Sequence, residues 1–230
     1  MRKPTAAPLH AWDLSPREAI ELQRRLVERL DLRRVPRDLR LVAGADMAFD
    51  KPRGLAFASV VLMSLPDLQI VEETGAAVPL TFPYVPGLLS FREGPGLLAA
   101  FGRLESQPDA AILDGQGIAH PRRLGLAAHM GLWFGIPTVG CAKSRLCGEH
   151  REPGRRKGNS APLMDGEEQI GVVLRTRTDV KPVFVSPGHL ADFDGSARLV
   201  LDCCTRYRLP EPTRLAHAAV GRLKAGHAGP

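Results

Sequence analysis

The sequence predicts an α/β fold with a central mixed sheet, made of three antiparallel strands and then parallel strands, flanked by helices. Three strand-like runs, 41–49, 55–65 and 68–78, are joined by short turn-forming segments. Connections this short link antiparallel strands. After Pro86, short apolar runs alternate with helical patterns, which is typical of parallel strands covered by helices.

Taken in order, the elements begin with a helix over about 15–30. Ser15 is suited to its N-cap and Pro16 to its first helical position. After the three strands, the patterns predict a helix over 94–107, a buried strand over 110–113, a helix over 121–134 opened by Pro121, and a buried strand over 136–142. Strands over 169–175 and 183–186 precede helices near 196–206 and 211–224. This strand order matches a ribonuclease H-like sheet.

No linker divides the chain, so we expect a single domain over 1–230 with a flexible tail from about 225. The apolar fraction is 44% and the charged fraction 24%, which is ordinary for a globular protein. A net charge of +6 suits a polyanionic partner such as nucleic acid. The four cysteines form no CxxC pair, which predicts a reduced, cytoplasmic protein. The sequence shows no export leader and no apolar run of membrane length, so we expect no association with a membrane.

Three acidic residues are candidates for chemistry. Strand alternation places Asp46 among small apolar residues, where a carboxylate is costly unless it is paired or bound to a cation; an exposed strand face is the alternative. Asp114 follows the strand 110–113, at the strand end where α/β sheets bind ligands, although a turn with Gly115 would also explain it. Glu93 precedes the helix 94–107, where an acid also suits the helix dipole. Together they would favour Mg²⁺, or Mn²⁺ as its substitute.

Basic and aromatic residues are candidates for binding. His120, Arg122 and Arg123 stand at the predicted start of the helix 121–134, where anions bind, unless His120 only caps that helix. Lys143 shares the sheet edge of Asp114 if their strands are parallel; a solvated Lys is the alternative. Tyr84 lies on a loop stiffened by two prolines, from which a ring can fill the gap left by an extruded base or simply pack on the surface.

Two further readings stay open at this point. The basic tract 151–158 has the pattern of an exposed hairpin loop, either solvated or in contact with phosphate. Cys141, His120 and Asp114 could form a cysteine hydrolase set. Cys141 lies inside an apolar run, however, and buried structural thiols are inert.

Five segments together resemble the endonuclease V family, the deoxyinosine-directed repair nucleases. In chain order, between about Leu41 and His217, they are VAGADMAFD, PYVPGLLSFREGP, LDGQGIAHPRRLGLAAHMGLWFGIPTVGCAKSRL, VSPGHL and LPEPTRLAH. The resemblance implies a ribonuclease H-like fold. It also implies cleavage of the second phosphodiester bond 3′ to the lesion, which leaves 3′-hydroxyl and 5′-phosphate ends.

The resemblance also implies roles for individual residues. Asp46, Glu93 and Asp114 match the metal-binding carboxylates, and His217 matches a late fourth position of the site. The positions implied around the DNA are His120 and Lys143 near the scissile phosphate, Tyr84 with Pro83, Val85 and Pro86 in the wedge, Gly87, Leu89, Gly115 and Gly140 in the hypoxanthine pocket, and Arg122 and Arg123 as further contacts.

The implied partner is DNA containing deoxyinosine, and inosine-containing RNA is left open as a second substrate. We expect the protein to act as a monomer, without an obligate protein partner. Two rival functions use the same features. One is another ribonuclease H-like nuclease, such as a branched-DNA resolvase, with the same acidic cage. The other is a nucleic-acid binding module without catalysis.

Overall fold

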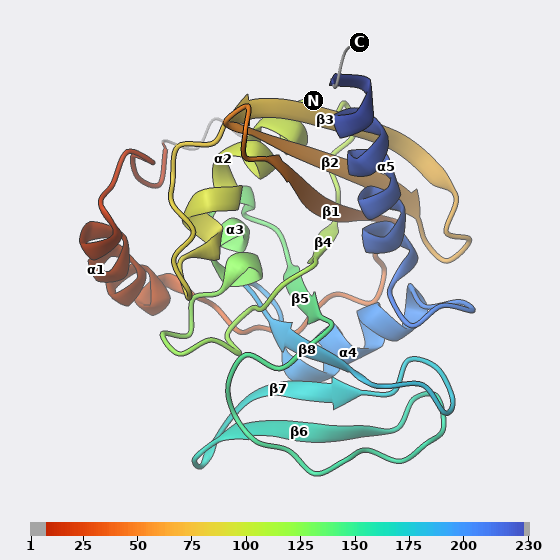
Figure 1. The fold of residues 1–230 in the computed structure, drawn as a ribbon. Helices are drawn as coiled ribbons and strands as arrows, with labels where there is room; N and C mark the ends of the chain where they lie inside the picture. Colours follow the sequence, from red (N-terminus) through yellow and green to blue (C-terminus); the bar gives the residue numbers. More distant parts are fainter. Residues whose placement is uncertain (1–7, 228–230) are drawn as a thin grey trace.

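Residues 8–227 are described by the structure, a computed structural model, and they form one mixed sheet with helices on both faces (Figure 1). The strand order is β3-β2-β1-β4-β5-β8-β7-β6. The elements are α1 (Pro16–Leu26), a 3₁₀ turn η1 (Val27–Arg29), β1 (Leu41–Asp50), β2 (Leu55–Ser64), β3 (Ile70–Pro79), α2 (Leu89–Phe101), β4 (Ala110–Leu113), α3 (Leu126–Phe134), β5 (Thr138–Ala142), β6 (Ser160–Asp165), β7 (Glu168–Leu174), β8 (Val183–Pro187), α4 (Phe193–Asp202) and α5 (Glu211–His227).

The first half of the sheet confirms the predicted order. Strands β1, β2 and β3 form an antiparallel meander, and β1, β4 and β5 are parallel neighbours. Beyond β5 the sheet turns antiparallel again through β8, β7 and β6. Strand β6 was not predicted. It contains Pro162 and lies at the sheet edge, where a missing N–H is tolerated.

Alternating side chains of β1 supply two separate cores. Val42 packs with residues of α4 and α5 on one face, whereas Ala43 and Ala45 pack with residues of α2 and α3 on the other. Because side chains alternate along a strand, Gly44 and Asp46 lie on the α5 side. A Cβ at Gly44 would collide with the backbone of Pro212. Helix α5 therefore lies directly against β1 beside Asp46.

Two predicted helix starts are wrong. Helix α2 begins at Leu89, so Glu93 lies one turn inside the helix and Pro95 is a helix residue. Helix α3 begins at Leu126, so Pro121 and the residues around it form a loop. The backbone of Arg123 has a left-handed φ of 55°. Ala127 N–H donates to the carbonyl of Gln116, 2.9 Å away. This backbone N–H at the start of α3 is therefore already hydrogen-bonded within the protein, and an anion could bind it only by replacing the Gln116 carbonyl.

The predictions for the two chain ends fall partly outside the described residues. Helix α1 begins as predicted, with Ser15 and Glu18 forming a capping box. Residues 225–227, assigned to the tail, continue α5, and 228–230 lie outside the described residues. The expected lack of an export leader rests partly on residues 1–7, which are also outside them. Between residues 8 and 227, no helix has the length and apolar character needed to cross a bilayer.

Candidate active site

Asp46 and Asp114 come together because their strands are parallel neighbours. In the register of β1 and β4, Ala45 lies opposite Leu113, so the next residues along the two strands are the two aspartates. Strand β4 ends at this point, which leaves Asp114 at the carboxyl rim of the sheet. The predicted position of Asp114 at a strand end is confirmed.

Glu93 reaches the same rim from α2 and is buried. Burial, together with the negative charges of Asp46 and Asp114, raises its pKa to about 8. The positive charge of the neighbouring Arg92 offsets only part of this rise. The three acids therefore lie close enough to repel one another, and a cation between them would relieve that repulsion.

Each aspartate already has a partner within the protein. The Nδ1 atom of His217, on α5, donates to the Asp46 carboxylate over 2.5 Å, and Lys143 forms an ion pair with Asp114. In residues 8–227, no three His, Cys, Asp or Glu side chains are arranged so that they could hold a metal ion. The acids have the donor chemistry of a magnesium site, but Asp46 and Asp114 are directed at His217 and Lys143.

Lys143 follows directly after β5, on the rim of Asp114, as its parallel strand predicts. Its backbone carbonyl accepts a hydrogen bond of 2.7 Å from Arg208, which also binds the carbonyl of Pro182 over 2.8 Å. The side chain of Lys143 is about half exposed. Lys143 is thus fixed at its backbone while its ammonium group remains accessible from solvent.

The loop 83–87 combines an exposed tip with a fixed base. Tyr84 is 71% exposed. Three residues later, the carbonyl of Gly87 accepts hydrogen bonds from His120 Nε2 (3.1 Å) and Arg122 Nη2 (2.8 Å). Gly87 has a φ of +78°, and a Cβ there would meet Arg122 at 2.6 Å, so glycine is required. The loop is held at its base and free at Tyr84.

His120 lies in this loop region rather than at a helix start. Its Nδ1 atom accepts from the Arg122 N–H over 3.1 Å, so the Nε2–H tautomer binds Gly87. Burial, together with the charge of Arg122, lowers the pKa of His120 to about 4. The ring is therefore neutral near pH 7, and both of its nitrogens are occupied. A phosphate could bind His120 only by replacing one of these partners.

The remaining predicted binding residues are also placed. Arg123 pairs with Asp165 and Glu168, and is not free for phosphate in this conformation. A Cβ at Gly140 would meet the backbone of Gly117 at 2.5 Å, so the loop after β4 lies directly against β5. A Cβ at Gly115 would meet the Leu126 side chain at 3.2 Å. These two glycines therefore keep the loop after β4 close to β5 and α3. Leu89 begins α2.

Gln23 is a residue of this region that the sequence patterns missed. It is wholly buried on α1 and hydrogen-bonds to the carbonyl of Gly87 over 3.0 Å. The available signal was its position, because it falls between Leu22 and Leu26 of the apolar stripe. A polar residue there needs a buried partner.

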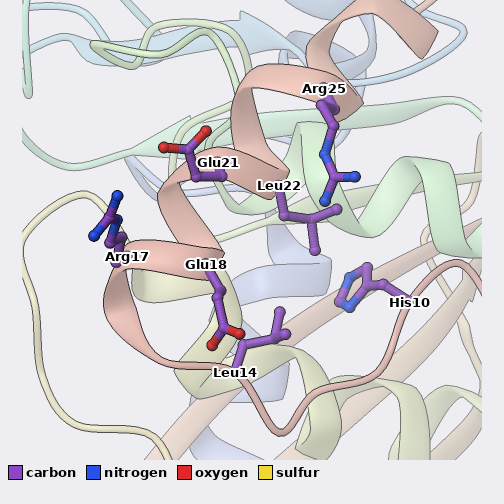
Figure 2. Close-up of a pocket in the computed structure, with 7 residues that line it drawn as sticks. All are labelled: His10, Leu14, Arg17, Glu18, Glu21, Leu22 and Arg25. Carbon is purple, nitrogen blue, oxygen red and sulfur yellow. The ribbon is translucent and has the colours of Figure 1, made fainter.

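Two surface hollows are lined by residues other than Asp46, Glu93 and Asp114. One of about 360 Å³ lies between α1 and the segment before it (Figure 2) and is lined by His10, Leu14, Arg17, Glu18, Glu21, Leu22 and Arg25. The other, of about 290 Å³, lies against α4. Neither contains any of the predicted site residues, so neither accounts for the convergence of acids at the rim.

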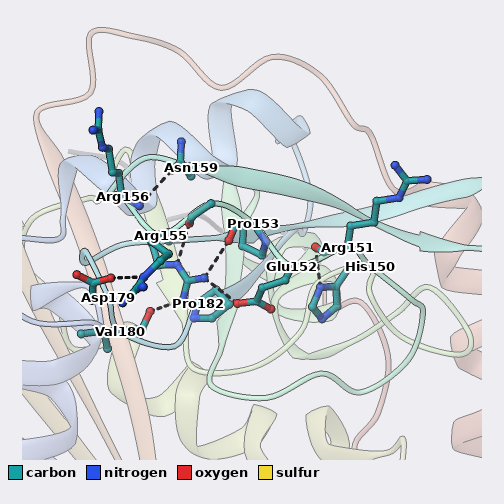
Figure 3. A network of polar contacts seen from close by, with 12 residues as sticks. His150, Arg151, Glu152, Pro153, Arg155, Arg156, Asn159, Asp179, Val180 and Pro182 are labelled. Carbon is teal, nitrogen blue, oxygen red and sulfur yellow. Dashed lines mark hydrogen bonds and ion pairs between the residues drawn. The ribbon is translucent and has the colours of Figure 1, made fainter.

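The basic tract 151–158 is a braced segment leading into β6, not the turn of a hairpin. Buried Arg175 donates to the carbonyls of Pro153, Gly154 and Val180, over 2.5 to 3.1 Å, and thereby ties the tract to the connection between β7 and β8. Arg155 pairs with Asp179 on the same connection (Figure 3). Most of the tract is exposed, as predicted.

Cys141 does not have the properties of a nucleophile. It is 2% exposed in β5. Burial raises the pKa of its thiol well above the ordinary value, and the nearby Cys204 and Asp114 raise it further. A thiol held neutral in this way is a poor nucleophile, which argues against the cysteine hydrolase alternative.

Comparison with known proteins gives consistent matches over most of the chain. The family model described as Endonuclease V matches residues 21–218. An Endonuclease V of Myxococcus xanthus is 50% identical over 214 residues, which are 93% of this chain and 91% of that protein.

Two solved structures extend the comparison to the fold. The crystal structure of Endonuclease V from Streptomyces avermitilis has a TM-score of 0.91 at 41% identity, covering 95% of this chain and 97% of that one. Endonuclease V of Ciona intestinalis, solved with a 23mer DNA containing an inosine followed by a ribo-adenosine, has a TM-score of 0.79 at 28% identity and covers 93% and 100% of the two chains. The predicted ribonuclease H-like fold is confirmed.

Proposed function

This chain belongs to the endonuclease V family, and from that premise we propose that it is a metal-dependent DNA repair endonuclease that recognises deoxyinosine. The proposed reaction is hydrolysis of the second phosphodiester bond 3′ to the lesion, which leaves a 3′-hydroxyl and a 5′-phosphate. The inosine-containing DNA bound by the Ciona intestinalis relative supports this substrate class.

One observation carries the catalytic part of the proposal. Strand β1, helix α2 and the end of β4 bring Asp46, Glu93 and Asp114 to one rim, where the pKa of Glu93 rises to about 8 through burial and through the charges of the other two. Carboxylate oxygens are ligands that Mg²⁺ and Mn²⁺ prefer. These three residues would hold the ion, with Asp46 and Asp114 turning from His217 and Lys143. When bound, such an ion activates water and neutralises charge on the phosphate.

The chain's own residues supply binding and orientation. Lys143, released from Asp114, can hold a phosphate oxygen at the rim through its ammonium group. His217, released from Asp46, can hydrogen-bond to the same strand or to the ordered water around it. Because His217 is 74% exposed, it can move without disturbing the core.

Recognition is proposed to begin at the loop 83–87. Tyr84 fills the space that the lesion base leaves when it is extruded, and the proline-stiffened loop loses little entropy on binding. Gly87, Leu89, Gly115 and Gly140 would receive hypoxanthine. Close backbone at glycine can distinguish the base edge, because hypoxanthine lacks the 2-amino group of guanine and carries a 6-oxo group unlike adenine.

The deciding experiment is incubation with an end-labelled duplex that contains a single inosine, with Mg²⁺, followed by mapping of the nick. We expect one nick at the second bond 3′ to inosine and none in a matched duplex with adenine. An inosine-containing RNA of the same sequence tests the wider substrate class. Preferential cutting of inosine-free branched DNA would instead favour a resolvase. Binding without cutting at any metal concentration would favour a non-catalytic module.

A further inference from the structure

Gln23 has a buried amide that the proposed chemistry does not use. It lies on α1 at 0% exposure, among the apolar residues Ala19, Leu22 and Leu26 that attach this helix to the rest of the protein. An amide buried in such surroundings costs free energy unless its hydrogen bonds are satisfied. The partners of Gln23 therefore indicate why a polar residue is placed there.

The three hydrogen bonds of the Gln23 amide connect two loops to α1. Its Nε2 group donates to the carbonyls of Gly87 and Leu124, each over 3.0 Å, and its Oε1 atom accepts from Arg122 Nε over 2.5 Å. The amide orientation follows from these partners, because carbonyls need a donor and a guanidinium needs an acceptor. In Figure 1 the segment between β3 and α2 runs between α1 and α2.

The Gly87 carbonyl is the point at which these contacts converge. It accepts from Gln23, from Arg122 Nη2 (2.8 Å) and from His120 Nε2 (3.1 Å). Gln23 also holds Arg122 through its guanidinium, so it contributes to this arrangement twice. Tyr84, three residues before Gly87, is 71% exposed. The base of the loop is thus fixed from one side by the helix and from the other by the loop before α3.

We propose that Gln23 is a positioning residue that ties helix α1 to the Gly87 carbonyl and thereby holds the loop 83–87 so that Tyr84 is presented to the DNA at the lesion. This inference rests on the proposed function, in which Tyr84 is the wedge. A loop already held in its binding conformation pays less ordering entropy when DNA binds. Gln23 makes no hydrogen bond to Asp46, Glu93 or Asp114, so we expect its loss to affect binding more than the chemical step.

The test is Gln23→Met, which keeps the length of the side chain and removes all three hydrogen bonds. Single-turnover nicking of an inosine duplex gives the half-saturating enzyme concentration and the maximal rate. We expect the former to rise about tenfold, as for the loss of a few buried hydrogen bonds, and the latter to stay within about twofold. The matched control is Ser15→Ala, which removes the capping box of the same helix without touching Gly87.

The outcomes separate this inference from the function on which it rests. If the unaltered protein nicks the inosine duplex no better than an adenine duplex, the proposed function is wrong. If it discriminates, but Gln23→Met binds as the unaltered protein does or loses only its maximal rate, the positioning role is wrong. An equal rise for Ser15→Ala at equal loss of stability would also overturn it. Should Gln23→Met not fold, Gln23→Asn keeps a neutral amide but is one methylene too short for the carbonyls of Gly87 and Leu124, and a rise in the same direction is expected.

Discussion

Asp114 is the residue for which the proposed function separates reaction from binding: we expect it to be essential for nicking and dispensable for binding DNA. Its carboxylate is paired with Lys143 at the rim of the sheet. We expect Asp114→Ala, and likewise Asp46→Ala, to lower the nicking rate by roughly a thousandfold or more, because each removes a carboxylate proposed to hold the ion. DNA binding should largely persist, since Asp114→Ala frees Lys143 for phosphate and Asp46→Ala removes no proposed DNA contact. Nicking rate and duplex affinity, measured on the same folded variant, check this; equal loss of both would contradict it.

Tyr84, unlike Asp114, is expected to contribute to binding and not to the chemical step. Because the ring is 71% exposed, we expect Tyr84→Ala to change the free energy of unfolding by no more than about 0.5 kcal/mol. Affinity for an inosine duplex should fall by roughly 1–3 kcal/mol, the range for loss of base–aromatic stacking. Affinity for an inosine-containing single strand should fall less, because there is no stacked duplex to open. Titrations of both substrates measure this, and identical losses would remove the wedge role.

At the scale of elements, the contact between β1 and α5 determines where His217 lies relative to Asp46. A Cβ at Gly44 would collide with the backbone of Pro212, so Gly44→Ala pushes α5 away from β1. We expect a loss of about 1–3 kcal/mol in unfolding free energy. We also expect reduced nicking in the fraction that folds, because His217 lies on the displaced helix. Urea unfolding and nicking assays provide the measurements.

The matched control for Gly44→Ala lies on α5 itself. Gly221 is helical, and a Cβ there meets nothing within 4 Å. Gly221→Ala should therefore stabilise the protein by about 0.5–1 kcal/mol, the ordinary difference between the two residues inside a helix. If both variants are destabilised to the same extent, sensitivity of α5 to any added methyl group, and not its contact with β1, explains the result.

Elements were predictable from sequence where local patterns determine them. Strand β4 and the first residue of α1 fall where apolar runs and the Ser15–Pro16 pair place them. Helix starts failed for the predicted helices 94–107 and 121–134, the second of which was taken to open at Pro121. Pro95 is tolerated inside α2, which starts earlier because Leu88 and Phe91 pack against α1. Such packing joins residues far apart in the chain, which no local pattern records.

The site was predictable to a similar extent and for a similar reason. Motif residues identified the three acids and Lys143, and the parallel pairing of β1, β4 and β5 brings Asp46, Asp114 and Lys143 to one rim. The ion pair of Arg123 with Glu168 and the contacts of Gln23 depend on tertiary approach. They were therefore invisible in a single sequence.

At the scale of the whole molecule, the N-terminal segment is coupled to the site through an aromatic cluster. His10 and Trp12 pack with Phe91, His129 and Trp133, from α2 and α3. A Cβ at Gly94, next to Glu93, would collide with the Trp12 ring. The segment containing His10 and Trp12 thus packs against the helix that carries Glu93. A change in the stability of this cluster is therefore expected to change the stability of the fold as a whole.

His129 gives this cluster a measurable pH dependence. Its Nδ1 atom lies 2.9 Å from Ser90 Oγ and its Nε2 atom lies 2.8 Å from His10 Nε2, and burial lowers its pKa to about 3. Below the unfolded value of about 6.5, the unfolded chain takes up a proton that the folded protein excludes. Stability is therefore full above pH 6.5 and declines as the pH falls toward 3, by about 1.4 kcal/mol for each pH unit.

His129→Gln removes this contribution, so the difference in unfolding free energy between the unaltered protein and the variant should shrink by about 2 kcal/mol from pH 6.5 to pH 5. Glu93, whose pKa is raised to about 8, acts in the opposite sense, because its folded form binds the extra proton. Glu93 is present in both proteins and cancels in the difference, provided that both are kept in a metal chelator. Urea unfolding at several pH values measures the difference. A pH-independent difference would mean that His129 is not held neutral in the fold.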